Sequence, residues 1–172
     1  MRLNVAQLLR EPTGATRSIT LDDEPLLDPD GGELGTVDGD LRLTKTARGI
    51  WVSGSVDIQV TDTCSRCLKA IEYTVPAMVD DEYLPQVDLV TGQKLRHDNE
   101  VDADTNSIDE HHELDLTETL RQYRLAGLPL AALCKEDCKG ICPQCGVDLN
   151  EETHDCVPEI DPRWEKLKEL LG

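Results

Sequence analysis

The sequence predicts an α+β fold: a small antiparallel β-sheet or partly open barrel, with a zinc-stapled C-terminal segment flanked by short helices. Two runs in the first half of the chain alternate apolar and polar residues, which is typical of half-buried strands. The segment after Leu133 is rich in cysteine and is too short to form a hydrophobic core of its own, which is typical of a zinc-stabilised segment. The 172 residues suffice for one main domain with an appendage.

The two strands are predicted from the parity of their apolar residues. In residues 50–60 the apolar side chains fall on one parity and the polar ones on the other. Residues 71–79 alternate in the same way. We expect the two runs to pair in antiparallel fashion, with Cys64 and Cys67 at the tip of their hairpin.

Weaker patterns precede these strands. Residues 41–46 are expected to form a third strand, so the natural architecture is a meander or a partly open barrel. A short helical turn is predicted at residues 4–10 and a short strand at residues 18–21. The sequence that follows contains several prolines and glycines, which are typical of turns.

An acidic stretch divides the chain. The predicted parts are a β-rich domain (1–84), an acidic and flexible connector (85–114), and a helix, zinc-knuckle segment and C-terminal helix (115–172). Asp115 and Glu118 match an N-cap with its reciprocal partner, and Gly127 ends that helix. Asp161 is expected to cap the last helix, whose apolar stripe begins at Trp164.

Charge and the N-terminal sequence limit the class of protein. The net charge of −18, from 35 acidic against 17 basic residues, disfavours sequence-specific DNA binding because it repels a phosphate backbone. A basic protein partner, or RNA bound through a local basic patch, remains compatible. Residues 1–14 lack a secretory apolar region, and no stretch reaches the roughly 20 apolar residues of a membrane span. We expect a soluble, cytoplasmic protein with reduced thiols.

Eight cysteine and histidine residues fall into four close pairs, which predicts one or two structural Zn²⁺ ions. The sequence CPQCG has the form of a zinc knuckle, and the predicted first site is Cys142, Cys145, His154 and Cys156. The second site is then Cys64, Cys67, Cys134 and Cys138, which requires the hairpin tip to meet the chain after the helix. The alternative places Cys134, Cys138, Cys142 and Cys145 around a single ion and leaves Cys64 and Cys67 as a reduced pair.

Catalysis is not expected from these residues. A catalytic zinc keeps an open coordination position and is usually rich in histidine, whereas this chain has four histidines. The alternative function is a thiol redox or metal-transfer protein that uses Cys64 and Cys67. Low thiol pKa values in redox CxxC motifs depend on a helix N-terminus, but this pair lies between predicted strands. A DNA- or polymerase-binding zinc ribbon is a second alternative, which the net charge opposes.

Several other side chains are candidates for contacts with a partner. Arg66, Lys69, Lys135 and Lys139 lie beside the cysteine pairs and could contact phosphate, although exposed turn charges are the simpler interpretation. Trp51 lies on the polar parity of its strand, where it either contacts a partner or packs under a loop or helix.

Five segments of the chain resemble the YceD family: NVAQLL (4–9), CSRCL (64–68), LPL after the predicted helix (128–130), LCKEDCKGICPQCGVDLN (133–150) and IDPRW (160–164). Members of that family often have CxC where this chain has His154-Asp155-Cys156, and histidine is an acceptable zinc donor. The resemblance implies a role in the accumulation of large-subunit (23S) ribosomal RNA, and the residues predict that this role is non-enzymatic. The implied partner is a large-subunit rRNA precursor or a basic ribosomal protein.

Overall fold

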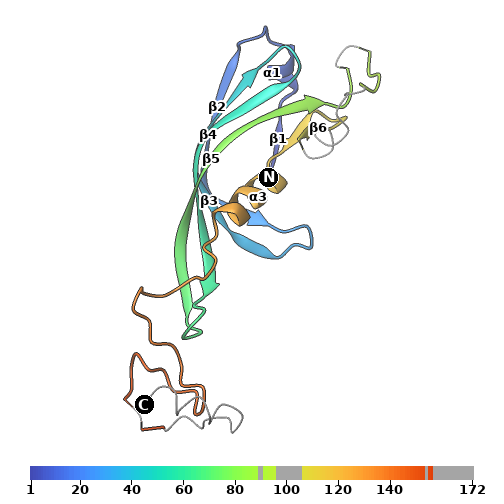
Figure 1. The fold of residues 1–172 in the computed structure, drawn as a ribbon. Helices are drawn as coiled ribbons and strands as arrows, with labels where there is room; N and C mark the ends of the chain where they lie inside the picture. Colours follow the sequence, from blue (N-terminus) through green and yellow to red (C-terminus); the bar gives the residue numbers. More distant parts are fainter. Residues whose placement is uncertain (89–90, 96–105, 154, 157–172) are drawn as a thin grey trace, which may run out of the picture. The chain divides into compact units, whose positions relative to one another are not determined.

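A computed structural model describes residues 1–88, 91–95, 106–153 and 155–156 (Figure 1). The chain divides into two compact units. Unit 1 comprises Met1–Asp62 and Glu72–Leu130, and unit 2 comprises Thr63–Ile71 and Ala131–Gly172. The first segment of unit 2 is therefore inserted into the sequence of unit 1. These divisions differ from the predicted boundaries at residues 84 and 114.

Unit 1 is built on a seven-stranded sheet with the order β1-β7-β6-β5-β4-β3-β2 in the described residues. The elements are β1 (Arg2–Asn4), α1 (Ala6–Arg10), β2 (Thr16–Leu27), β3 (Glu33–Lys45), β4 (Ile50–Thr63), β5 (Ala70–Pro85), β6 (Ser107–Ile108), β7 (Glu113–Asp115) and α3 (Thr117–Gly127). The β5–β6 pair is parallel, whereas β1–β7, β2–β3, β3–β4 and β6–β7 are antiparallel. The β4–β5 connection is too short for a parallel crossover. The sheet is thus mixed rather than purely antiparallel as predicted.

The sheet of unit 1 curls into a half-barrel, with α3 on its concave side (Figure 1). Two glycines on neighbouring strands permit this curvature, Gly39 at φ 146° and Gly54 at φ 157°. A Cβ atom on Gly39 would lie 2.4 Å from the Ser55 carbonyl oxygen, and one on Gly54 would lie 2.2 Å from that of Asp40. Because the strands approach so closely, only glycine fits at these positions.

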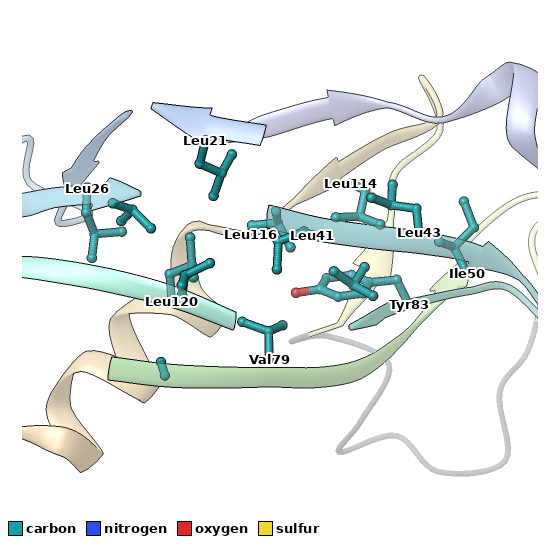
Figure 2. Close-up of a cluster of buried hydrophobic side chains, with 14 of the residues drawn as sticks. Leu21, Leu26, Leu41, Leu43, Ile50, Val79, Tyr83, Leu114, Leu116 and Leu120 are labelled. Carbon is teal, nitrogen blue, oxygen red and sulfur yellow. The ribbon is translucent and has the colours of Figure 1, made fainter. Parts of the chain in front are cut away.

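The concave side of the sheet carries the hydrophobic core. The buried side chains of β4 are Ile50, Val52, Val56, Ile58 and Val60, which confirms the predicted parity. Residues from β2, β3, β5, β7 and α3 belong to the same cluster (Figure 2), as does Ile108 of β6. Leu8 and Leu9 of α1 join the same core. Tyr83 is fully buried within it, so a polar hydroxyl group lies among aliphatic side chains.

The structure differs from the predictions in the acidic region. Residues 85–114 contain β6 and the beginning of β7, where the sequence predicts a connector. Ile108 and Leu114 are both fully buried in the core. Two isolated apolar residues produce no periodicity, so such short strands give no recognisable pattern. Their backbone pairing with β5 and β1 keeps them in place.

Helix α3 ends at Gly127 as predicted, but the predicted reciprocal cap at its start is wrong. Asp115 accepts a hydrogen bond from the Thr117 amide at 2.9 Å. The Glu118 carboxylate instead binds Arg121, at 2.6 Å and 2.7 Å. An ion pair with an arginine three residues later in the helix is stronger than the predicted hydrogen bond to a preceding backbone amide. The predicted helix starting at Asp161 lies outside the described residues.

Candidate metal centres

Four cysteine sulfur atoms from distant parts of the sequence meet in unit 2. The Sγ atoms of Cys64, Cys67, Cys134 and Cys138, here called the four-cysteine cluster, all lie within 4.8 Å of one another. The Sγ–Sγ distance is 3.9 Å for Cys64–Cys138 and 3.6 Å for Cys67–Cys134. Tetrahedral zinc with Zn–S bonds of about 2.3 Å holds its sulfur atoms about 3.8 Å apart. The spacing fits a metal site with four thiolate ligands.

Main-chain hydrogen bonds hold the two contributing segments together. The Cys64 amide donates to the Lys69 carbonyl at 2.8 Å, which closes the turn between β4 and β5. The Ser65 amide donates to the Ala132 carbonyl at 2.8 Å and attaches that turn to the chain after α3. The cysteines are thus positioned by backbone contacts that do not depend on the sulfur atoms.

A second group of sulfur atoms lies in the CPQCG knuckle and the segment after it. Cys142, Cys145 and Cys156, here called the three-cysteine cluster, also lie within 4.8 Å of one another. These residues match three of the four ligands predicted for the first site. The predicted fourth ligand, His154, lies outside the described residues. The structure therefore groups the cysteines differently from the single-ion alternative.

The turns of the two clusters share one backbone design. The Gly146 amide donates to the Cys142 carbonyl at 2.9 Å, and Gly146 has a φ of 75°. In the other turn the Leu68 amide donates to the Cys64 carbonyl at 3.0 Å, and Leu68 has a φ of 60°. A left-handed conformation costs a non-glycine residue about 1–2 kcal/mol. Leu68 adopts it nonetheless, as expected where the surrounding turn determines the backbone.

Backbone amides favour the thiolate form of Cys64. Hydrogen bonds from the amides of Cys67 and then Arg66 lower the pKa of Cys64 to about 6, against the opposing effect of burial. The Cys138 side chain raises the pKa of Cys134 to about 12. Crowded thiols cannot all lose their protons while they face one another, unless a cation neutralises their charge. This chemistry fits a bound metal ion.

Asn150 acts on the four-cysteine cluster from the turn that follows the knuckle. Its Nδ2 atom lies 3.5 Å from Cys138 Sγ, and its Oδ1 accepts a hydrogen bond from the Lys139 amide at 3.0 Å. Burial acts to raise the pKa of Cys138, but the Gly140 amide and the Asn150 side chain outweigh it, and the pKa is lowered. Sequence reasoning missed Asn150, because no spacing rule marks a turn residue as the partner of a distant thiol.

Lys69 connects the same turn to the β4–β5 connection. Its Nζ atom lies 2.8 Å from Asp148 Oδ2 and also contacts the Glu151 carboxylate. The hydrogen bond from Lys69 lowers the pKa of Asp148 to about 2, and the same contact raises the pKa of Lys69. A lysine predicted as a phosphate contact is therefore paired with two carboxylates.

The other predicted contact residues have different surroundings. Arg66 donates to the Cys138 carbonyl at 2.8 Å, while the side chains of Lys135 and Lys139 are exposed. Trp51, in unit 1, is 44% exposed, and its Nε1 donates to Asp80 Oδ1 at 2.7 Å. Trp51 therefore does not pack under a loop or helix of the described residues. In the part of the chain that the structure describes, neither helix is long and apolar enough to cross a bilayer.

Comparisons with known proteins point to one family. The model of a family described as "Large ribosomal RNA subunit accumulation protein YceD" matches residues 52–171. Uncharacterized proteins of Mycobacterium tuberculosis and Mycobacterium bovis are each 34% identical over 136 residues, 79% of this chain. One of Mycobacterium leprae is 29% identical over 133 residues, 77% of this chain. This chain covers 62% of the length of the first two relatives and 58% of the third. No solved structure shows a significant match.

Proposed function

Because the chain belongs to the YceD family of large ribosomal RNA subunit accumulation proteins, we propose that it supports the accumulation of large-subunit (23S) ribosomal RNA. The family match over residues 52–171 carries this proposal, and it includes every cysteine of both clusters. The protein acts by binding, without catalysis. Four thiolates around a tetrahedral ion leave no coordination position open for a substrate, which supports this part of the proposal.

The metal ions of this proposal are structural Zn²⁺. Sets of four thiolates favour zinc, and His154 is the proposed fourth ligand of the three-cysteine cluster. In the described part of unit 2, the small core consists of Cys64, Cys67 and Cys138, with three partly buried aliphatic residues packed against them. So little apolar surface supplies little folding free energy, whereas metal binding supplies about 10–16 kcal/mol in zinc-finger peptides. The proposed ion thus supplements the small core of the described part of unit 2.

The rRNA role is tested in cells from which the gene has been deleted. The ratio of 23S to 16S rRNA should fall and should be restored by the intact protein. A Cys64→Ser/Cys138→Ser variant should fail to restore it, whereas Leu130→Ser, at a fully exposed position, should restore it. An unchanged ratio in the deletion strain would contradict the proposed function.

Thiol alkylation separates a structural metal role from the redox and metal-transfer alternative. Thiolates bound to zinc should resist alkylation until a chelator is added. A redox pair at Cys64 and Cys67 should react at once and yield a disulfide on mild oxidation. Metal analysis of the purified protein supplies the number and identity of the ions. Immediate reaction without metal loss would favour the redox alternative.

A further inference from the structure

The convex side of the sheet in unit 1 presents a broad face with an unusual composition. Its side chains are those of β3, β4 and β5 that alternate with the core residues, and we call them the outer face. In the described residues, both helices contribute side chains to the core on the concave side. The acidic residues of the outer face include Asp38, Asp40, Asp57, Glu72 and Asp80, against the single cation Arg42 on the same parity of β3.

Two large apolar side chains lie on this acidic face. Trp51 of β4 is 44% exposed and Met78 of β5 is 74% exposed. The hydrogen bond from Trp51 to Asp80 fixes the indole ring beside a carboxylate. Met78 lies two residues before Asp80, so the two side chains leave the same face of the strand. Tryptophan and methionine are enriched in protein interfaces, and tryptophan dominates their binding energy.

The charges of the outer face are not balanced within the strands. Asp38 of β3 lies directly opposite Asp57 of β4 in the antiparallel register. Like charges in that arrangement destabilise a sheet. The Asp23 amide donates to Asp38 at 2.8 Å, which satisfies one oxygen but does not neutralise the charge. A positively charged partner would offset this repulsion.

A surface hollow of about 410 Å³ lies on the same face. Its lining includes Ser53 and Ser55, whose short side chains lie on the outer parity of β4, opposite Arg42 and Asp40 of β3. Arg42 and Asp40 border it. The hollow can receive a side chain of a partner, because the serine side chains that line it are short.

We propose that the outer face binds a lysine- and arginine-rich segment of a protein. Trp51 and Met78 are its apolar anchors, and a cation over the indole ring is also attracted by Asp80. The carboxylates of Asp38, Asp40 and Asp57 pair with further cations of the segment. RNA is disfavoured at this face because its phosphates would meet the same carboxylates. This inference deepens the proposed function and rests on it only for the source of the segment, an assembling large subunit.

The test measures binding of a fluorescently labelled peptide, rich in lysine and arginine with interspersed leucines, to the full-length, zinc-loaded protein. Trp51→Ala should weaken binding by about tenfold or more, as expected for an interface anchor. Met78→Ser should also weaken binding, and its high exposure makes a folding defect unimportant. Asp57→Asn should weaken binding yet raise the thermal midpoint, because it removes the repulsion with Asp38.

Matched controls separate this site from general attraction to an acidic protein. Glu11→Gln and Asp30→Asn remove exposed charges of unit 1 outside these strands, and binding should change far less than with Asp57→Asn. Equal losses in both sets would overturn the inference, as would unaltered binding in Trp51→Ala and Met78→Ser. Preferential binding of a single-stranded RNA of the same charge magnitude, with loss in Trp51→Ala, would also overturn it and assign the face to RNA.

Cellular measurements distinguish this inference from the proposed function. If gene deletion lowers 23S rRNA while the outer-face variants bind the peptide as tightly as the unaltered protein does, the docking inference fails and the proposed function stands. If the peptide binds as predicted but deletion leaves 23S rRNA unchanged, the docking surface stands and the proposed function fails.

Discussion

The hydroxyl oxygens of Tyr83 and Thr119 lie 2.6 Å apart in the core of unit 1, where Tyr83 is 0% and Thr119 4% exposed. The contact joins β5 to α3. The Thr119 hydroxyl also lies 3.4 Å from Asn106 Oδ1. A buried polar pair satisfies its hydrogen bonds in one relative position only, so it fixes where α3 lies on the concave side of the sheet.

Replacing Tyr83 by phenylalanine should lower the free energy of unfolding of unit 1 by about 1–3 kcal/mol, because the Thr119 hydroxyl loses its principal partner. Urea denaturation measures the change. The double variant Tyr83→Phe/Thr119→Val should be more stable than the sum of the single changes predicts. Tyr123→Phe is the control, since its hydroxyl donates to Asp81 in a less buried position and should cost less. Equal costs at the two tyrosines would contradict the role of burial.

Leu68→Gly should stabilise the metal-loaded protein by about 1 kcal/mol, because glycine adopts a positive φ without steric cost. The leucine side chain is 62% exposed, so little burial is lost. Thermal unfolding in the presence of added zinc measures the gain. Leu68→Ala keeps the Cβ atom and should bring no gain. An increase with alanine equal to that with glycine would exclude backbone strain as the cause.

Asn150→Ala should weaken metal binding at the four-cysteine cluster by about tenfold, since a donor to a metal-bound sulfur is lost. Competition with a coloured chelator gives the affinity. Glu152→Ala alters an exposed side chain of the same turn and should leave the affinity unchanged. A similar effect of both substitutions would mean that the turn is merely destabilised.

Glu118→Gln should reduce stability at neutral pH but not in acid. Hydrogen bonds from Arg121 and then Gln122 lower the pKa of Glu118 to about 2. The contribution of the ionised Glu118 side chain to the free energy of unfolding is complete above the ordinary glutamate pKa of about 4.3. It is lost as the pH falls towards about 2. It should be about 0.5 kcal/mol, because the pair is partly exposed and solvent screens it. Thermal midpoints of both proteins should converge as pH falls, and a constant difference would refute the ionic cause.

If the cysteine clusters hold zinc as proposed, its removal should unfold unit 2 and leave unit 1 largely intact. The hydrophobic cores of the two units are separate clusters, and the small one is built on cysteines. Amide hydrogen exchange with and without a chelator should show loss of protection at residues 64–69 and 131–153, with β3 and β4 unchanged. Loss of protection throughout the sheet would show that the units unfold together.

The sequence predicted those parts of the fold whose pattern is local. Period-2 alternation identified β4 and β5, because one face of each strand packs against the core. The alternation did not predict the pairing of β1 with β7, because that pairing joins residues from distant segments, such as Leu3 and Leu114. A partly open barrel was among the predicted architectures, but the positions at which the sheet curls were not predicted, since they depend on how Gly39 and Gly54 approach the neighbouring strands.

The cysteine sites were predictable in part for a related reason. Short spacings identified the pairs, because one turn presents two sulfur atoms to one ion. Which pairs share an ion depends on where residues 64–69 lie relative to residues 131–141, and the sequence left both arrangements open. The left-handed conformation of Leu68 carried no signal, since leucine is not the residue that such a turn ordinarily selects.

The pairing of β1 with β7 has a consequence for synthesis on the ribosome. Strands β2 to β5 follow one another and can form hydrogen bonds as each emerges from the exit tunnel. Strand β1 emerges before all of them, yet its partner is translated only after β5 and β6. Until then β1 has no partner strand, and the edge of β5 stays unpaired until β6 has been translated. The nascent chain is therefore most open to misassociation between the translation of β5 and that of β7.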